Sequence, residues 1–182
     1  MNGEVHLFPK EARVEFSGVY QMKNKTDSVI DTIHSNFNRR MPYSTFKWSR
    51  PCQNVYSDSA YGWDMFFFDP PIKPGEIFSL EFSGERRRAG FSNGGVSKTV
   101  VENGTMIWSG DLFPTFGYSP ERELSSKRTR KKHGLSENQD PMLKYNDLEG
   151  NKHSILGDDA DWVDFEVVMS TDINQIAMAP GY

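Results

Sequence analysis

The chain has only one cysteine, a small net charge and no long apolar run, and each of these excludes some classes of protein. Cys52 is the single cysteine among 182 residues, which excludes an internal disulfide framework and a multi-cysteine zinc site. The net charge of −4 is mild and favours neither a nucleic-acid binder nor an acidic tail. The most apolar stretch, residues 65–68, is far too short to cross a bilayer, and no basic segment leads into an apolar run as in a signal peptide. We therefore expect a soluble chain as given.

A zinc-peptidase motif is also missing. The motif H-E-x-x-H places two imidazoles one helical turn apart, with a glutamate that activates water. None of the four histidines is followed by glutamate: His6, His34, His133 and His153. We therefore expect no catalytic residue, no metal site and no bound cofactor in this chain, which by itself is not an enzyme.

Strand patterns, by contrast, are abundant. Aromatic residues make up 13% of the chain, and such residues suit half-buried pleated surfaces. Residues 13–23 alternate apolar and polar over their whole length, which predicts a long strand with one buried face. Similar but shorter patterns predict strands at 4–8, 29–37, 63–68, 77–82, 162–169 and 174–179.

Turn residues complete this picture. Asn103-Gly104 between apolar runs predicts a hairpin over 99–108, and 70–75, with three prolines and a glycine, predicts a rigid turn. Residues 38–61 show no clean period, so we expect them to be irregular. Residues 135–157 are expected to form a polar loop.

One short helix is predicted near the middle of the second half. Ser119 suits the N-cap and Pro120 the first helical position, with Glu121 and Glu123 in the first turn, where the helix dipole favours acids. Cations crowd the far end, where Gly134 ends the helix: Lys127, Arg128, Arg130, Lys131, Lys132 and His133. The prediction is an all-β fold, an antiparallel sandwich or saddle of about eight or more strands with one short helix, forming a single domain over 1–182.

Several groups have a chemical and a structural interpretation. Cys52 and His34 form a conceivable nucleophile pair, but no helix start lies near Cys52 to lower its pKa, so an inert cysteine is favoured. The glycine-rich stretch 90–95 lacks the spacing of a phosphate loop. The aspartates within 158–164 lack the ligand pattern of a calcium loop and favour a solvated turn.

The remaining groups also favour structural interpretations. The basic run at 127–132 suits a helix end better than a phosphate or lipid site. Asn24 and Asn103 begin glycosylation tripeptides, which are frequent by chance. Six aromatic residues predict core positions rather than a sugar or peptide groove, with some apolar surface left facing outward: Trp63, Phe66, Phe67, Phe68, Phe78 and Phe82.

The order of several short segments resembles a known family. They are 74–76 (Pro-Gly-Glu), 103–105 (Asn-Gly-Thr), 117–118 (Gly-Tyr), 123–124 (Glu-Leu), 134–135 (Gly-Leu), 159–162 (Asp-Ala-Asp-Trp) and 179–181 (Ala-Pro-Gly). Together they resemble the N-terminal β domain of aminopeptidase N-type zinc peptidases, in the branch fused to an ABC-transporter permease.

The resemblance implies a non-catalytic domain that packs on a zinc-bearing catalytic domain and shapes the substrate cleft. It implies a peptide substrate for the whole protein, and a membrane-associated bacterial parent whose catalytic domain follows this chain. In related aminopeptidases this domain supplies a Glu or Gln that binds the substrate's free amine, here Glu121 or Glu123, although the family's motif around that residue is not reproduced. The alternative is a free-standing cell-surface β-sandwich module that binds glycan or protein. No nucleic-acid partner and no direct membrane insertion are expected.

Overall fold

The computed structural model describes residues 1–38, 42–88, 100–117, 123–137 and 163–179. The chain divides into two compact units, Met1–Gly117 with Asp164–Tyr182, and Tyr118–Val163. Each unit is described by itself below. The single domain expected over 1–182 stays a prediction.

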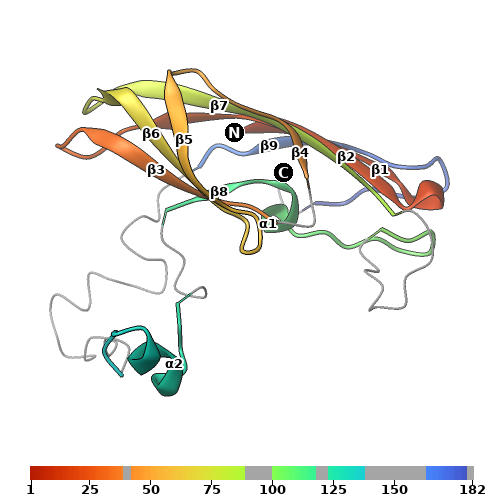
Figure 1. Cartoon of the computed structure of the whole chain (residues 1–182). Helices are drawn as coiled ribbons and strands as arrows, with labels where there is room; N and C mark the ends of the chain where they lie inside the picture. The colour runs from red at the N-terminus through yellow and green to blue at the C-terminus, as the bar shows by residue number, and fades with distance from the viewer. Residues whose placement is uncertain (39–41, 89–99, 118–122, 138–162, 180–182) are drawn as a thin grey trace, which may run out of the picture. The chain divides into compact units, whose positions relative to one another are not determined.

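The first unit is a two-sheet β structure (Figure 1). Sheet A has the order β4-β7-β2-β1-β9, with bounds Tyr43–Trp48, Ile77–Arg87, Arg13–Lys23, Asn2–Phe8 and Glu166–Ser170. Sheet B has the order β5-β6-β3-β8, with bounds Cys52–Asp58, Trp63–Ile72, Ile30–Asn36 and Thr115–Phe116. All strand pairs are antiparallel except β1 with β9. The predicted all-β, sandwich-like class is therefore confirmed.

The long alternation in residues 13–23 forms β2 with the predicted bounds. Val14 and Phe16 face the core and are at most 2% exposed, while Val19 on the opposite face is 46% exposed. Period-2 alternation sends successive side chains to opposite faces, and only one face of sheet A meets the core.

Aromatic side chains join the two sheets. Trp48 of sheet A contacts Phe66 and Phe68 of sheet B at ring-centroid distances of 5.6 and 5.2 Å. Phe46 stacks on Phe66 at 5.4 Å, and Phe78 approaches Phe68 at 6.4 Å. Four of the six aromatics expected in the core are buried there: Phe66, Phe68, Phe78 and Phe82. Phe67 points outward and is 39% exposed, in line with the expected outward-facing apolar surface.

Two glycines in sheet A accommodate aromatic rings from the neighbouring strand. Gly18 pairs with Phe82, and a Cβ placed on Gly18 would lie 2.6 Å from Cζ of that ring. Gly84 pairs with Phe16, whose ring would meet a Cβ on Gly84 in the same way. Without side chains, the two glycines let both rings lie flat against the sheet.

The expectation that 38–61 is irregular is wrong, because β4 and β5 lie there. Each has a register shift in its pairing, between Tyr43 and Thr45 in β4 and between Asn54 and Tyr56 in β5. Such an irregularity inserts a residue and resets the in–out alternation, which hides a strand from a period-2 search. Cys52 consequently lies at the start of a strand rather than in an irregular loop.

Other local predictions also need correction. The segment 100–108 has a turn, closed by Gly104 N–H donating to Val101 O at 3.4 Å, but no paired hairpin strands. Pro70 and Pro71 continue β6, and the turn is confined to the residues around Gly75, whose φ is +75°. Of the two predicted closing strands, only β9 forms; 174–179 is not a strand, and β9 pairs with β1 instead.

Short helices connect the strands. A 3-10 turn, η1 at Pro9–Glu11, follows β1, and α1 at Ser109–Leu112 lies between β7 and β8 in the chain. The hydroxyl of Tyr43 donates to Leu112 O at 3.0 Å, and that of Tyr20 donates to Pro114 O at 3.1 Å. These two hydrogen bonds attach the end of α1 to sheet A.

The second unit contains α2 at Lys127–Lys132, shorter than predicted. Its N-cap residue is Ser126. Ser119 and Pro120, where the helix is predicted to begin, lie outside the described residues. The predicted end is right, since Gly134 has φ +71° and Leu135 N–H donates back to Arg130 O at 3.0 Å. The basic residues Arg130, Lys131 and Lys132 occupy the last turn.

Candidate functional site

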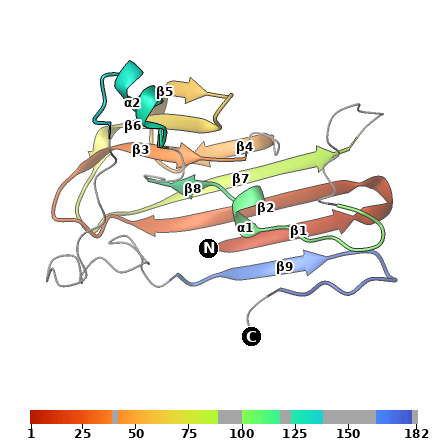
Figure 2. The ribbon, with the colours of Figure 1, turned by 90° about the horizontal axis from the view of Figure 1, so that it is seen from below.

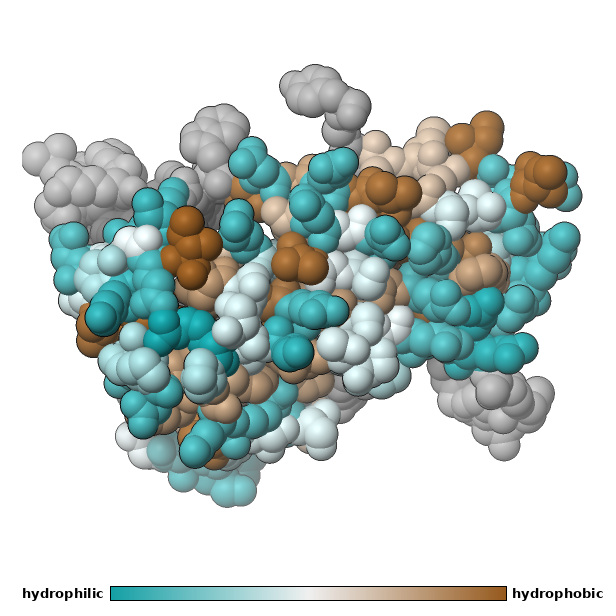
Figure 3. Space-filling model, turned by 90° about the horizontal axis from the view of Figure 1, so that it is seen from above, coloured by the Kyte–Doolittle hydropathy of each residue, from teal (hydrophilic) through white to brown (hydrophobic). Residues whose placement is uncertain are grey.

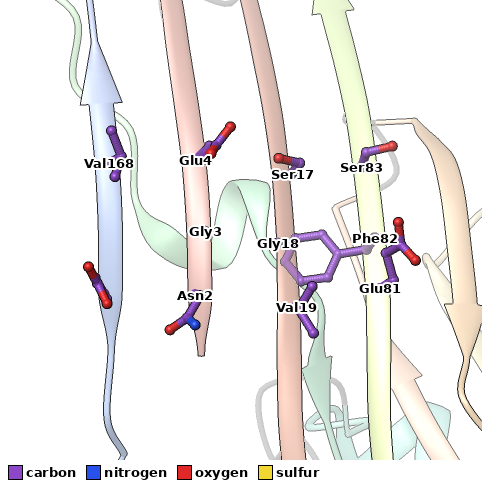
Figure 4. Close-up of a pocket in the computed structure, with 11 residues that line it drawn as sticks. Asn2, Gly3, Glu4, Ser17, Gly18, Val19, Glu81, Phe82, Ser83 and Val168 are labelled. Carbon is purple, nitrogen blue, oxygen red and sulfur yellow. The ribbon is translucent and has the colours of Figure 1, made fainter.

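A polar trough of about 400 Å³ lies on the face of sheet A opposite the core. Its side chains form two rows across four strands (Figure 4). The strand registers give the rows as Val168, Glu4, Ser17 and Ser83, then Glu166, Asn2, Val19 and Glu81. The short serines in one row lie between longer neighbours, which accounts for the hollow.

The trough carries three carboxylates, on Glu4, Glu81 and Glu166, and none of the described residues that line it is basic. The lining residues in the described part of the chain include neither a histidine nor a cysteine. In Figure 3, which views the molecule from above, hydrophobic side chains are scattered among hydrophilic ones. Its carboxylates and hydroxyls give the trough the composition of a surface that meets cationic or hydroxyl-bearing groups.

A second surface is apolar. Met106 and Trp108 are 69% and 68% exposed on the segment that leads to α1. Ile173, Ile176 and Met178 are 97%, 87% and 85% exposed on the segment after β9. Figure 2 shows both segments near β1 and β9, and the amide of Gln175 ties them together by donating to Glu102 O at 2.6 Å. We call these five side chains the apolar patch.

So many large apolar side chains at such exposure distinguish the patch from the scattered single residues of an ordinary surface. Several large exposed apolar side chains on two linked segments are typical of protein–protein contact sites. The sequence pattern does not indicate the patch, because it predicts that 174–179 is a paired strand. The signal available was the apolar alternation of Ile176 and Met178 without a partner strand of matching pattern.

Of the two residues predicted to bind a substrate amine, the structure describes only Glu123. Glu121 lies outside the described residues. Glu123 is exposed, precedes α2 rather than lying in its first turn, and is 3.5 Å from Nη1 of Arg130. The helix-dipole interpretation of Glu123 is therefore wrong; its carboxylate forms an ion pair with Arg130, whose side chain is 11% exposed.

Cys52 and His34 are not brought together. Cys52 in β5 is opposite Phe68 of β6, while His34 in β3 is opposite Met65 of the same strand. One strand therefore lies between them, roughly 9–10 Å across, in addition to three residues of register. Burial raises the pKa of the Cys52 thiol, so the neutral form is favoured. This agrees with an inert cysteine.

The outer face of sheet B carries an aromatic cluster. The rings of His34 and Trp63 stack with an interplanar angle of 3° at 5.3 Å, and Tyr56 lies 5.1 Å from Trp63. Tyr56 is 46% exposed. Flat ring surfaces that border solvent are suited to stacking on apolar faces of a ligand.

Asn24 has a structural role, and two further candidate segments are not described by the structure. Asn24, the first glycosylation candidate, is 2% exposed, and its amide donates to Ser28 O and Ile72 O. That side chain is a structural element of the turn. The glycine-rich stretch 90–95 and the aspartates at 158, 159 and 161 lie outside the described residues.

No group of three or more acidic, histidine or cysteine side chains in the described parts of the chain is arranged to hold a metal ion. Within the same residues, no helix has the length and apolar character needed to cross a membrane.

Comparison with known proteins gives likeness in structure only. No protein-family model matches the chain, and no curated protein does so. An M1 zinc metallopeptidase from Deinococcus radiodurans matches at 14% identity over 48% of this chain and 20% of that chain, with a TM-score of 0.34. A two-domain M1 zinc metallopeptidase mutant bound to L-tryptophan matches at 15% identity over 48% and 20%, with a TM-score of 0.33.

This chain thus spans about a fifth of the length of the peptidases that it matches. At TM-scores this low no functional argument follows from the likeness. The function has to be argued from the sequence and from the surfaces described above.

Proposed function

We propose that this chain is a non-catalytic β domain that packs, through its apolar patch, on the catalytic domain of a zinc aminopeptidase-like protein. The observation that carries the proposal is the apolar patch itself, five large side chains 68–97% exposed on two segments joined by one hydrogen bond. Leaving such side chains in water is unfavourable, at about 25 cal/mol for each Å² that a partner could cover.

The identity of the partner rests on the sequence. The short sequence segments between 74–76 and 179–181, and their order along the chain, resemble the N-terminal domain of aminopeptidase N-type peptidases. The H-E-x-x-H motif that such an enzyme needs is absent from this chain. A domain of this kind leaves the chemistry to its neighbour and shapes access to the neighbour's cleft. The same resemblance supports a parent protein attached to a membrane through a fused permease.

The test begins with the purified chain and the separately produced zinc-peptidase domain encoded in the same reading frame. Calorimetric titration should show binding that Ile176→Lys weakens at least tenfold, because a buried lysine charge loses its hydration. Val55→Lys is the matched control, since Val55 is also exposed but lies on β5 in sheet B, away from the patch. Equal affinity for the two variants would refute docking through the patch, as would a reading frame without an H-E-x-x-H segment.

Zinc content and aminopeptidase activity of the purified chain test the non-catalytic role separately. We expect neither stoichiometric zinc nor turnover. Stoichiometric zinc with turnover would overturn the proposal, because the metal would then be held by side chains of this chain.

We also propose Glu121 or Glu123 as the group that binds the substrate's free amine in the full-length protein. A carboxylate at this place would pair with the protonated amine. The ion pair between Glu123 and Arg130 argues against Glu123, because the substrate amine would have to displace Arg130 from it. One of the two full-length variants, Glu121→Ala or Glu123→Ala, should lose discrimination for free N-termini, seen as a fall in kcat/KM for free but not for acetylated peptides. Unchanged discrimination in both variants would dismiss the assignment.

The alternative, a free-standing module that binds glycan, is favoured by one observation, the stacked His34–Trp63 pair beside Tyr56. Sugars present apolar C–H faces that stack on such rings. A glycan ligand would change the tryptophan fluorescence of the chain, and Trp63→Ala would abolish that change. No response to a panel of neutral and acidic oligosaccharides would rule this alternative out.

A further inference from the structure

The outer edge of β9 is a second interaction surface, distinct from the apolar patch. β9 ends sheet A, with β1 on one side (Figure 2). Glu166 N–H donates to Met1 O at 2.9 Å, so the backbone groups of Glu166 point toward β1. Because successive residues of a strand alternate, the N–H and C=O groups of Val167 and Met169 point away from β1, to the edge that no described strand pairs with.

The other sheet edges among the described residues carry features that discourage pairing. β4 and β5 both contain register shifts, and Lys47 adds a charge on β4. β8 is only two residues long. Bulges, charges and short length are the usual protections of edge strands. β9 has no register shift in its pairing with β1, and its sequence EVVMS contains neither proline nor lysine; its one charged side chain, Glu166, lies on the outer face of the sheet.

The described segments before and after β9 are each anchored to other parts of the first unit. The N-terminal amine donates to Asp164 O, and Phe165 packs against Phe113 at 6.1 Å, so the chain before β9 is tied to the inner side of sheet A. The chain after β9 is tied to Glu102 through Gln175.

We propose that two copies of this chain pair through β9, antiparallel about a two-fold axis at Val168, to join two copies of sheet A into one continuous sheet. This symmetry places Val167 opposite Met169 of the second copy, and the reverse. Each such pair exchanges two N–H···O=C hydrogen bonds, so the four outward-pointing groups of each copy are all used.

The side chains are self-complementary in this register. On the outer face, Glu166 lies opposite Ser170 of the second copy, so no two carboxylates face each other, and Val168 lies opposite its own counterpart. On the inner face, the half-buried side chains of Val167 and Met169 already pack on the core and gain an apolar neighbour across the axis. The occupant that fits this edge is therefore a second copy of the same strand.

Sedimentation velocity of the full chain tests the proposal. A species of twice the 20.8 kDa chain mass should grow with protein concentration. Val168→Lys should abolish it, because two ammonium groups would meet at the axis, whereas Val168 is 57% exposed and the monomer fold tolerates lysine there. Val55→Lys, at a 50% exposed position on the bulged β5 edge, is the control and should dimerise as the parent does.

Cross-linking tests the register independently. Residues opposite each other at a non-hydrogen-bonded antiparallel position have Cα atoms about 4.5 Å apart, within the span that a disulfide bridges. In a Cys52→Ser background, Val168→Cys should form an intermolecular disulfide under mild oxidation, and Val55→Cys should not. A strictly monomeric chain, or a dimer that survives Val168→Lys, would overturn the proposal.

Dimerisation through β9 rests on other residues than the proposed docking of a catalytic domain on the apolar patch, so each proposal can be refuted without the other. Ile176→Lys lies in the apolar patch and should leave dimerisation unchanged, while it weakens binding of the catalytic domain. Val168→Lys should do the reverse.

Discussion

Replacing Gly18 by alanine tests whether the rings buried in sheet A require the two glycines. A Cβ on Gly18 would lie 2.6 Å from Cζ and 3.1 Å from Cε1 of Phe82, and 3.1 Å from the backbone oxygen of Asn2. Phe82 is fully buried and also contacts Tyr20 at 5.4 Å and Phe113 at 5.7 Å, so its ring has little room to move.

Two opposing effects set the magnitude. Alanine restricts the unfolded chain, which stabilises a protein by about 0.4–1 kcal/mol where the site is compatible. Overpacking a buried site costs about 1–3 kcal/mol. Because the clash involves the centre of the core, we expect the second effect to win, with a net loss of roughly 1–2 kcal/mol. In a chain of this size each kcal/mol lowers the Tm by about 2–4 °C.

Urea unfolding followed by circular dichroism measures the loss, with Gly110→Ala as the control, since nothing lies within 4 Å of a Cβ there. Phe82→Leu removes the atom that clashes, so the double variant should cost less than the sum of the two single variants. An additive double variant, or Gly18→Ala as stable as the parent, would refute the explanation.

Two further predictions concern buried polar groups. Asn24→Asp replaces the amide that donates to Ser28 O and Ile72 O by a carboxylate that faces two carbonyl groups. The variant should lose about 1–3 kcal/mol or more of its free energy of unfolding in the same urea assay. An unchanged stability would show that these hydrogen bonds do not hold the turn. Burial raises the pKa of Tyr20 to about 12, against about 10 in an unfolded chain, so the folded state keeps a proton that the unfolded state loses. The contribution of Tyr20 to the free energy of unfolding is therefore constant below about pH 10 and falls between pH 10 and 12, by about 1.4 kcal/mol for each unit of pKa difference. Tyr20→Phe should show a smaller fall over this range than the parent, and equal slopes would exclude this cause.

Strands with one buried face could be predicted from the sequence, because alternation reports directly on burial. β2 has its predicted bounds, and β3 and β6 begin within a residue of theirs. β4 and β5 could not be found in this way, since a register shift in each resets the alternation. The hairpin expected at Asn103-Gly104 shows that a turn signal alone does not pair strands.

The candidate surfaces were less accessible to sequence reasoning. The apolar patch depends on a hydrogen bond between Gln175 and Glu102, and the open edge depends on the parallel pairing of β9 with β1, the first and last strands of the first unit. Neither long-range contact leaves a local pattern. The sequence instead predicts that β9 pairs with the next segment, 174–179, because consecutive strands usually pair.

Methionine oxidation provides the most direct test that the apolar patch is a docking surface. Met106 and Met178 are 69% and 85% exposed, so dilute peroxide should oxidise both rapidly in the isolated chain, whereas the half-buried Met65 on sheet B serves as an internal reference. Mass spectrometry of the chain joined to its catalytic domain should show slowed oxidation of Met106 and Met178 relative to Met65. The same relative rates in the isolated and joined forms would mean that the patch stays in water, and would contradict the proposed role of this domain.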